Sequence, residues 1–322
     1  MEHKPPEPDG PDSILVIRTG GIGAFVQALS AFAAIRMFHS GARITLLTDA
    51  ELSSFAAVAP YFDVIETEAG RAGGLHGLVR ERPWSIVYDL DTSSRTDRLY
   101  QSSKTWRQKF GLDTPVRWCG TAKGCALPHD NPDRLLMHVS DRMMDQLVHA
   151  GLEDNPPVSL AWVSRSVGTF SLPISLSEPF VLITVDACEA NGAQWTPARC
   201  MELAELITAR GNRAVLVGET AADPIREAVL DSVPDAVDLC GKASHVEVVF
   251  LAWAAVSAVG NDNGLMRLIS AAGCRSIVLY DPGSDAALAG HRGPDVTILR
   301  RHDLAAITAP EVMQRLDAGS AA

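Results

Sequence analysis

Apolar positions along the chain form two series in which short buried strands alternate with amphipathic helices. In the first series, apolar runs predict strands at Ser13–Arg18, Arg43–Leu47, Val64–Ile65 and Ser85–Leu90. Apolar residues at helical spacing predict a helix from Ala24 to about His39. Strands that alternate with helices in this way are typical of a parallel sheet with helices on both faces.

The middle of the chain is less regular. Residues 106–127 carry few strong signals, and residues 155–175 are expected to form a linker or short strands. Between these stretches, one clear helix is predicted at 138–150. Its apolar positions predict a shared face made of Val139, Met143, Leu147 and Val148.

A second alternating series begins near residue 180. It predicts strands at Phe180–Val185, Arg213–Val217, Ser257–Gly260, Arg275–Tyr280 and Val296–Leu299. Helices are expected from Pro197 to about Arg210, with Thr196 as the N-cap, and at 224–230, 245–253, from 264 and at 310–316.

The two series predict two doubly wound α/β domains, which we place at 13–155 and 179–322 with a linker at 156–178. Residues 1–12, which are polar and rich in proline, are expected to be a disordered tail. In such sheets ligands bind beyond the carboxyl ends of the strands. The expected site is therefore a cleft between the two domains.

Composition narrows the class of protein. A chain of 322 residues is long enough for two domains, and 47% hydrophobic with 21% charged residues excludes a disordered chain. Acidic residues outnumber basic ones, 39 to 28, for a net charge of −11. This balance argues against nucleic-acid binding, which needs an excess of Lys and Arg. An anionic substrate would need a local positive site.

The cysteines and the N-terminus indicate the compartment. The six cysteines form no C-x-x-C pair, so we expect reduced, buried thiols and no zinc ribbon. The chain does not open with a signal-peptide pattern, and its longest early apolar run, Ile14–Ile17, is far shorter than a membrane span. These features predict a cytoplasmic protein.

A glycine turn follows the first predicted strand. Gly20, Gly21 and Gly23 could bring backbone close to a ligand at a helix N-terminus. The dinucleotide fingerprint is incomplete, because Val26 occupies the place of its third glycine. With Asp49 as a ribose-binding acid, an NAD(P)-dependent oxidoreductase remains an alternative. The simpler interpretation is a tight strand–helix turn without a ligand.

A second turn, Gly260–Arg267 (GNDNGLMR), joins a predicted strand to a predicted helix. Backbone amides at the start of a helix favour an anion. Asp262 is placed to hold a hydroxyl group or to cap the helix, and Arg267 could pair with a phosphate. The alternative is a capped helix with a solvated arginine.

Three segments together resemble a known family. They are Ile14–Phe32, Trp195–Leu206 and Leu239–Gly273, the last ending in a G-N-D-x-G-x-M pattern. In these segments the chain is similar to glycosyltransferase family 9, the ADP-heptose:lipopolysaccharide heptosyltransferases. Because the segments lie near both ends of the chain in the family's order, the resemblance covers nearly all of it.

The resemblance implies a GT-B fold, in which two Rossmann-like domains face a cleft. It implies inverting transfer of a sugar, with ADP-heptose as the favoured donor, to a lipopolysaccharide-type or other glycan acceptor. No catalytic metal or tightly bound cofactor is implied, and a lipid-linked acceptor implies peripheral contact at the inner face of the membrane. The implied donor-binding residues are Asp262, Asn263, Gly264, Leu265 and Arg267. The implied acceptor-side turn contains Gly20, Gly21 and Gly23.

The chain departs from the family pattern at two functional positions. Ala24 stands where the family has an Asp that acts as general base, and Ala193 aligns with a Lys that contacts donor phosphate. Asp186, expected at a strand's carboxyl end, is the first candidate for a replacement base, followed by Asp91 and Glu189. Arg267 is the candidate for the missing cation. The alternative is a catalytically impaired GT-B protein that binds a sugar nucleotide or a partner protein.

Overall fold

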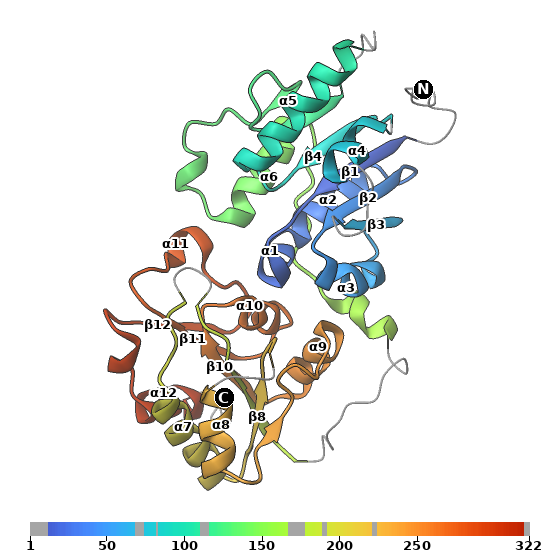
Figure 1. Ribbon diagram of the computed structural model, residues 1–322. Coiled ribbons are helices and arrows are strands. Elements are labelled where there is room, and N and C mark those ends of the chain that lie inside the picture. The colour runs from blue at the N-terminus through green and yellow to red at the C-terminus, as the bar shows by residue number, and fades with distance from the viewer. Residues whose placement is uncertain are drawn as a thin grey trace. The chain divides into compact units, whose positions relative to one another are not determined.

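The computed structural model describes residues 12–67, 74–81, 83–109, 116–166, 178–188, 192–220 and 224–318. The chain divides into two compact units, Met1–Val158 and Ser159–Ala322 (Figure 1). Residues 1–11 of the expected tail, residues 167–177 of the expected linker and Glu189 lie outside the described residues. Within the expected linker, the structure has a 3-10 helix, η3 (Ala161–Ser166), which packs against a helix of the second unit.

The first unit is built on a parallel sheet of six described strands in the order β3-β2-β1-β4-β5-β6. The strands are β1 (Ser13–Ile17), β2 (Arg43–Thr48), β3 (Val64–Thr67), β4 (Ile86–Asp89), β5 (Arg117–Gly120) and β6 (Leu127–Pro128). Four of them confirm predicted strands. The central residues of β1, β2 and β4 are buried on both faces, which explains why these strands are continuous apolar runs.

Helices cover both faces of this sheet (Figure 1). They are α1 (Gly21–Gln27), α2 (Leu29–Phe38), α3 (Ser53–Val58), α4 (Gly74–Glu81), α5 (Ser94–Lys109) and α6 (Val139–His149), with 3-10 turns η1 (Ala50–Leu52) and η2 (Arg134–Leu136). Helices α4 and α5 pack together over the face that carries Leu15 and Ile17. Helix α2 packs against α6.

The first predicted helix differs from the structure. It begins earlier, at Gly21, and a bend of 52° at Ala28 divides it into α1 and α2. The Ala24 carbonyl accepts a hydrogen bond from Arg18 Nε at 3.0 Å, and the Ala28 amide donates to Phe25 instead. A side chain inserted into the helical hydrogen-bond ladder is a recognised cause of kinks. Periodicity within the helix could not reveal it, because Arg18 comes from the preceding loop.

Two further predictions for this unit need correction. Val148 is 49% exposed and does not share the buried face of α6, which is formed by Met143, Met144, Gln146 and Leu147. The sequence analysis also missed α5, which extends into the segment that showed few signals. Helix α5 buries only a narrow strip that includes Leu99 and Tyr100, so its apolar pattern is weak.

The second unit repeats the plan of the first. Its six described parallel strands have the order β12-β11-β10-β7-β8-β9, which places the unit's first and fourth strands side by side, as in the first sheet. The strands are β7 (Phe180–Thr184), β8 (Arg213–Val217), β9 (Val237–Asp238), β10 (Ser257–Asn261), β11 (Ser276–Tyr280) and β12 (Val296–Arg300). This order is that of the Rossmann fold.

The helices of this unit confirm the five predicted ones, and the structure adds α11 (Ala286–Ala289). They are α7 (Pro197–Ala209), α8 (Pro224–Ser232), α9 (His245–Ala254), α10 (Gly264–Ala271), α11 (Ala286–Ala289) and α12 (Ala309–Asp317), with the 3-10 turn η4 (Leu304–Ala306). Thr196 caps α7 as predicted, and Ser244 forms a capping box at α9. Helices α7, α8 and α12 cover one face of the sheet, while α9 and α10 pack together on the other (Figure 1).

Gly260 allows strand β10 to lie close to its neighbour. A Cβ at this position would lie 1.7 Å from Thr184 Oγ1 and 2.9 Å from Met266 Cγ. The position therefore has no room for any side chain. It lies next to Asn261 at the end of β10, where the loop to α10 begins.

We expect Gly260→Ala to lower the free energy of unfolding by at least about 3 kcal/mol, because overpacking here would push β10 away from β7. Urea unfolding followed by circular dichroism measures this change. Gly41→Ala is the matched control, since nothing lies within 4 Å of a Cβ at that turn. Equal effects of the two substitutions would contradict the packing argument.

Candidate functional site

Both candidate turns lie at topological switch points. In the first sheet, the loops after β1 and β4 leave adjacent strands, and in the second sheet the loops after β7 and β10 do so. Ligands of doubly wound sheets bind where neighbouring loops diverge in this way. The fold brings two pairs of predicted residues together within their own units: Gly20 with Asp49, and Asp186 with Asn263.

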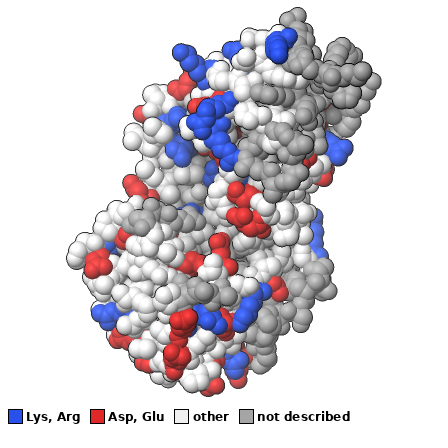
Figure 2. Space-filling model, viewed as in Figure 1, with Lys and Arg blue, Asp and Glu red and all other residues white. Residues whose placement is uncertain are grey.

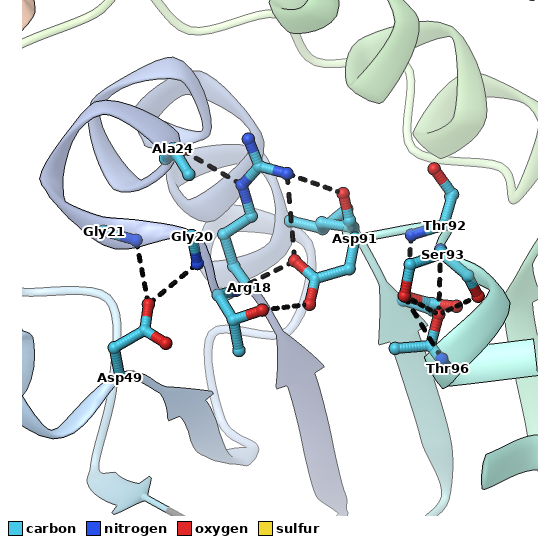
Figure 3. A network of polar contacts seen from close by, with 12 residues as sticks. Arg18, Gly20, Gly21, Ala24, Asp49, Asp91, Thr92, Ser93 and Thr96 are labelled. Carbon is cyan, nitrogen blue, oxygen red and sulfur yellow. Dashed lines mark hydrogen bonds and ion pairs between the residues drawn. The ribbon is translucent and has the colours of Figure 1, made fainter. Parts of the chain in front are cut away.

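The glycine turn of the first unit holds an internal carboxylate. Gly20 and Gly21 adopt positive φ angles of 100° and 75°, and their amides donate to Asp49 Oδ2 at 2.8 and 2.9 Å (Figure 3). Gly23 lies within α1 and is buried. The structure corrects the interpretation of Asp49 as a ribose-binding acid: its carboxylate binds the amides that a pyrophosphate would need.

Asp91 follows β4, the strand beside β1 at this switch point, and binds the loop after β1. Its two carboxylate oxygens accept hydrogen bonds from the Thr19 amide at 2.8 Å and the Thr19 hydroxyl at 2.7 Å (Figure 3). Arg18 lies 3.8 Å from the same carboxylate and donates to the Leu90 and Ala24 carbonyls. Asp91 and Arg18 therefore connect the ends of β1 and β4 to the start of α1.

Asp89, at the end of β4, is a buried carboxyl that the sequence analysis did not single out. Its Oδ1 accepts a hydrogen bond from the Thr92 amide at 3.0 Å, while its Oδ2 has no partner among the described residues. Burial raises the pKa of Asp89 to about 7, against the lowering effect of the Thr96 and Thr92 hydrogen bonds. Thr92 itself has a positive φ of 45°.

In the second unit, two asparagines hold the backbone of the neighbouring loop. Asn261 and Asn263 donate their side-chain amides to the Asp186 carbonyl at 2.9 and 3.0 Å. Asn263 also caps α10, because its Oδ1 accepts a hydrogen bond from the Met266 amide at 2.9 Å. Gly264 and Leu265 follow in the buried first turn of α10.

A charged pair lies buried beside α10. Arg267 donates to Asp262 Oδ1 at 2.7 Å and to the Ala289 carbonyl at 3.2 Å, and both charged side chains are less than a tenth exposed. Burial opposes ionisation of Asp262, but the His291 hydrogen bond and the Arg267 charge outweigh it and lower its pKa. The structure therefore gives Arg267 an internal partner instead of the solvated position considered above.

His291 completes this cluster from the loop after α11, and sequence patterns did not reveal it. Burial lowers the pKa of His291 to about 4, so its ring is neutral and donates from Nε2 to Asp262 Oδ1 at 2.9 Å. Its backbone amide donates to the Tyr280 hydroxyl at 3.3 Å. Only the fold shows that His291 reaches Asp262, 29 residues away.

The Asp186 carboxylate lies at the end of β7, as predicted, and is partly exposed. Both of its oxygens lie within hydrogen-bond distance of one backbone amide, that of Glu219, at 3.1 and 3.2 Å. The Cys188 amide donates to the Ala193 carbonyl at 2.7 Å. Ala193 contacts the core of the second unit.

The six cysteines are free and buried, which confirms the expected reduced thiols. Burial raises the pKa of Cys119, Cys240 and Cys274 to about 12, so these thiols stay protonated near neutral pH.

The raised pKa of Asp89 predicts how stability depends on pH. The folded state keeps a proton up to about pH 7, whereas the unfolded chain releases it near 3.8. Asp89 therefore costs the wild type about 1.4 kcal/mol of stability per pH unit as pH rises between these values, and the loss levels off above pH 7. Asp89→Asn mimics the protonated form and lacks this slope.

We expect Asp89→Asn to gain stability relative to the wild type as pH rises from 4 to 7, measured by urea unfolding at several pH values. Asp130→Asn, which alters an exposed carboxylate, is the control. Parallel pH profiles for wild type and Asp89→Asn would disprove the assignment of the raised pKa.

Comparisons with solved structures show which known fold the chain shares. E. coli ADP-heptose lipopolysaccharide heptosyltransferase II matches with a TM-score of 0.72 and 18% identity over 95% of this chain and 98% of that one. A family 9 glycosyltransferase from Veillonella parvula gives 0.74 and 16% over 95% and 96%. E. coli heptosyltransferase WaaC with ADP gives 0.72 and 15% over 95% and 99%. The two described sheets and these likenesses establish the GT-B fold.

A comparison with curated protein sequences found no match. Within the described part of the chain, no single helix is long and apolar enough to cross a membrane, and only the bent pair α1–α2 meets that criterion by length and composition.

The family model for glycosyltransferase family 9 (heptosyltransferase) matches residues 142–307, more than half of the chain, including both asparagines of the β10–α10 turn. The chain therefore belongs to glycosyltransferase family 9 and is a glycosyltransferase enzyme.

Proposed function

We propose that the enzyme transfers heptose from ADP-heptose, with inversion at the anomeric carbon, to a lipopolysaccharide-type or other lipid-linked glycan. The observation that carries this proposal is the β10–α10 turn, which lies at a switch point inside the matched family region. The solved complexes of E. coli WaaC with ADP and with ADP-2-deoxy-2-fluoro heptose support an ADP-sugar donor. Reaction on such an acceptor takes place at the cytoplasmic face of a membrane.

The donor diphosphate binds at the start of α10 in this proposal. The positive end of the helix dipole favours an anion there, and Gly264 adds no side chain that would keep a phosphate away. Arg267 takes part through Asp262: their charges cancel, so the buried acid beside the turn does not repel the diphosphate. Direct contact between Arg267 and phosphate stays a prediction.

The general base is Asp186 in this proposal, with Asp91 as the alternative. A base must lie close to the bound donor. Asp186 is partly exposed at the carboxyl end of β7, and its backbone carbonyl is held by Asn261 and Asn263 of the β10–α10 turn, whereas Asp91 lies in the first unit. Asp186 would take the proton of the acceptor hydroxyl as that oxygen attacks the anomeric carbon and the diphosphate leaves.

Helix α5 supports an anionic acceptor. In a chain of net charge −11, this helix carries five basic side chains and one acidic one. Figure 2 shows Lys and Arg side chains gathered over α5 in the first unit. Such a surface fits the phosphate or carboxylate groups of a lipid-linked glycan, by long-range attraction that salt screens. The sequence analysis did not identify this basic surface, because it did not predict α5.

We expect the wild type to bind ADP-heptose by calorimetry more tightly than UDP- or GDP-sugars, and to transfer its sugar. Asp186→Asn should lower kcat about 10²–10⁴-fold and leave the donor Kd unchanged, because it removes the base without touching the donor turn. Asp91→Asn is the matched comparison, and we expect a smaller loss of kcat there. A normal kcat for Asp186→Asn together with a large loss for Asp91→Asn would transfer the role to Asp91.

The catalytically impaired alternative gives a distinct result in the same assay. An impaired protein would bind the donor without transfer or donor hydrolysis, and would gain activity from Ala24→Asp with Ala193→Lys. Family membership favours the active enzyme. Measurable wild-type transfer would therefore exclude the impaired form.

The acceptor surface predicts a salt-dependent effect. We expect Arg98→Glu with Lys109→Glu to raise the acceptor KM several-fold at low salt, with a smaller effect at high salt, because exposed charges on α5 attract the acceptor. The donor KM should not change. Arg315→Glu in the second unit is the control for net charge. An equal rise in acceptor KM for the control would show that α5 has no specific part.

A further inference from the structure

A cluster of possible metal ligands lies on the first unit and includes no residue of either turn. It consists of His129, Asp145 and His149, which we call the α6 cluster. His129 follows β6, while Asp145 and His149 lie one turn apart on α6. Their ligand atoms all lie within 4.8 Å of one another. Neither the sequence analysis nor the proposed reaction uses these residues.

The contacts in the α6 cluster converge on one carboxylate oxygen. His129 Nε2 and His149 Nδ1 lie 2.7 and 3.8 Å from Asp145 Oδ2. Asn131 donates to the same oxygen at 2.8 Å, and His149 Nδ1 lies 2.8 Å from the Asp145 carbonyl. The His129 side chain is fully buried, whereas that of His149 is 38% exposed. The cluster therefore has a rigid buried side and a side open to solvent.

We propose that the α6 cluster binds a divalent transition-metal ion, with Zn²⁺ as the favoured ion. Two imidazole nitrogens and one carboxylate oxygen form a donor set that suits zinc and leaves a fourth position for water. Ligands about 2.1 Å from a tetrahedral Zn²⁺ lie about 3.4 Å apart. The distances of 2.7 and 3.8 Å bracket this spacing, so small side-chain rotations form the site.

Binding requires a change of tautomer in both rings. His129 now directs its Nε2–H and His149 its Nδ1–H at oxygen atoms of Asp145. To coordinate a metal through these nitrogens, each ring must free the lone pair there, so the proton moves to the other ring nitrogen. His129 Nδ1 is buried without a partner among the described residues. An outer-shell partner on the second ring nitrogen typically strengthens metal binding about 10–100-fold. His129 lacks such a partner among the described residues, so we expect EDTA to remove the metal.

The metal would fasten the edge of the first sheet. Helix α6 packs against β5, β6 and α2, and an ion shared by His129 and α6 joins β6 to this helix. The next residue on α6, Gln146, donates to the Asp89 and Cys119 carbonyls at 2.8 and 3.3 Å. The ion would thus stabilise the first unit at the ends of β4 and β5 without taking part in sugar transfer.

Zinc titration of the untagged full-length chain tests this proposal. The protein is stripped with EDTA, which is then removed, and Zn²⁺ is added in competition with a fluorescent zinc indicator. We expect one equivalent to bind, and binding to weaken at least about tenfold in His149→Ala and in Asp145→Asn. His149 carries the test, because its side chain is 38% exposed and we expect its loss to leave the fold intact, which circular dichroism checks.

His302→Ala, which removes an exposed histidine of the second unit, should bind zinc like the wild type. Co²⁺ in place of Zn²⁺ distinguishes the ligands, since nitrogen and oxygen ligation lacks the thiolate charge-transfer band that a cysteine site would show. Absence of binding to the wild type, equal binding to His149→Ala and wild type, or a thiolate band would each overturn the proposal.

Discussion

The order of strands in the two parallel sheets is the constraint on which the sites depend. In each sheet the chain begins in the middle, proceeds to one edge and returns to add a strand beside the first. The loops after these two adjacent strands must leave in opposite directions, and they leave backbone groups without ladder partners. Polar side chains at the strand ends bind these groups, which explains why acids and asparagines concentrate there.

Buried charge in the second unit follows the same need for partners. Asp262 lies at the end of β10 and is almost fully covered, so its ionised form needs donors. Arg267 and His291 supply them from two different segments. With Arg267 charged and His291 neutral, the cluster of Asp262, Arg267 and His291 has no net charge. A protonated His291 would give the same cluster a net positive charge. The neutral state of His291 is thus part of the charge balance of this buried cluster.

Most of the fold could be predicted from the sequence, because its strands are apolar runs and its helices carry recognisable caps. Thr196 with Pro197 shows this: the cap and the first helical residue are local signals. Features that depend on distant residues could not be predicted. The bend at Ala28 arises from the hydrogen bond that Arg18 donates to Ala24. Asp49 binds the amide of Gly21, which is 28 residues away in the sequence. Helix α5 was missed for another reason, because it has too few apolar positions to reveal its buried strip.

In both units, side chains bind backbone groups at the strand ends that have no partner in the sheet. The first unit uses side chains that accept hydrogen bonds, and the second uses side chains that donate them. In the first unit, Asp49 and Asp91 accept from amides of the turn, so carboxylates already neutralise its anion-binding groups. In the second unit, Asn261 and Asn263 donate to a carbonyl, and these neutral side chains leave the helix N-terminus without a competing charge. The first turn therefore carries two carboxylates, whereas the second is held by neutral amide side chains. Although both units share one strand order, their turns differ in capping chemistry, and this difference is the reason for proposing the donor site at the second turn instead of the first.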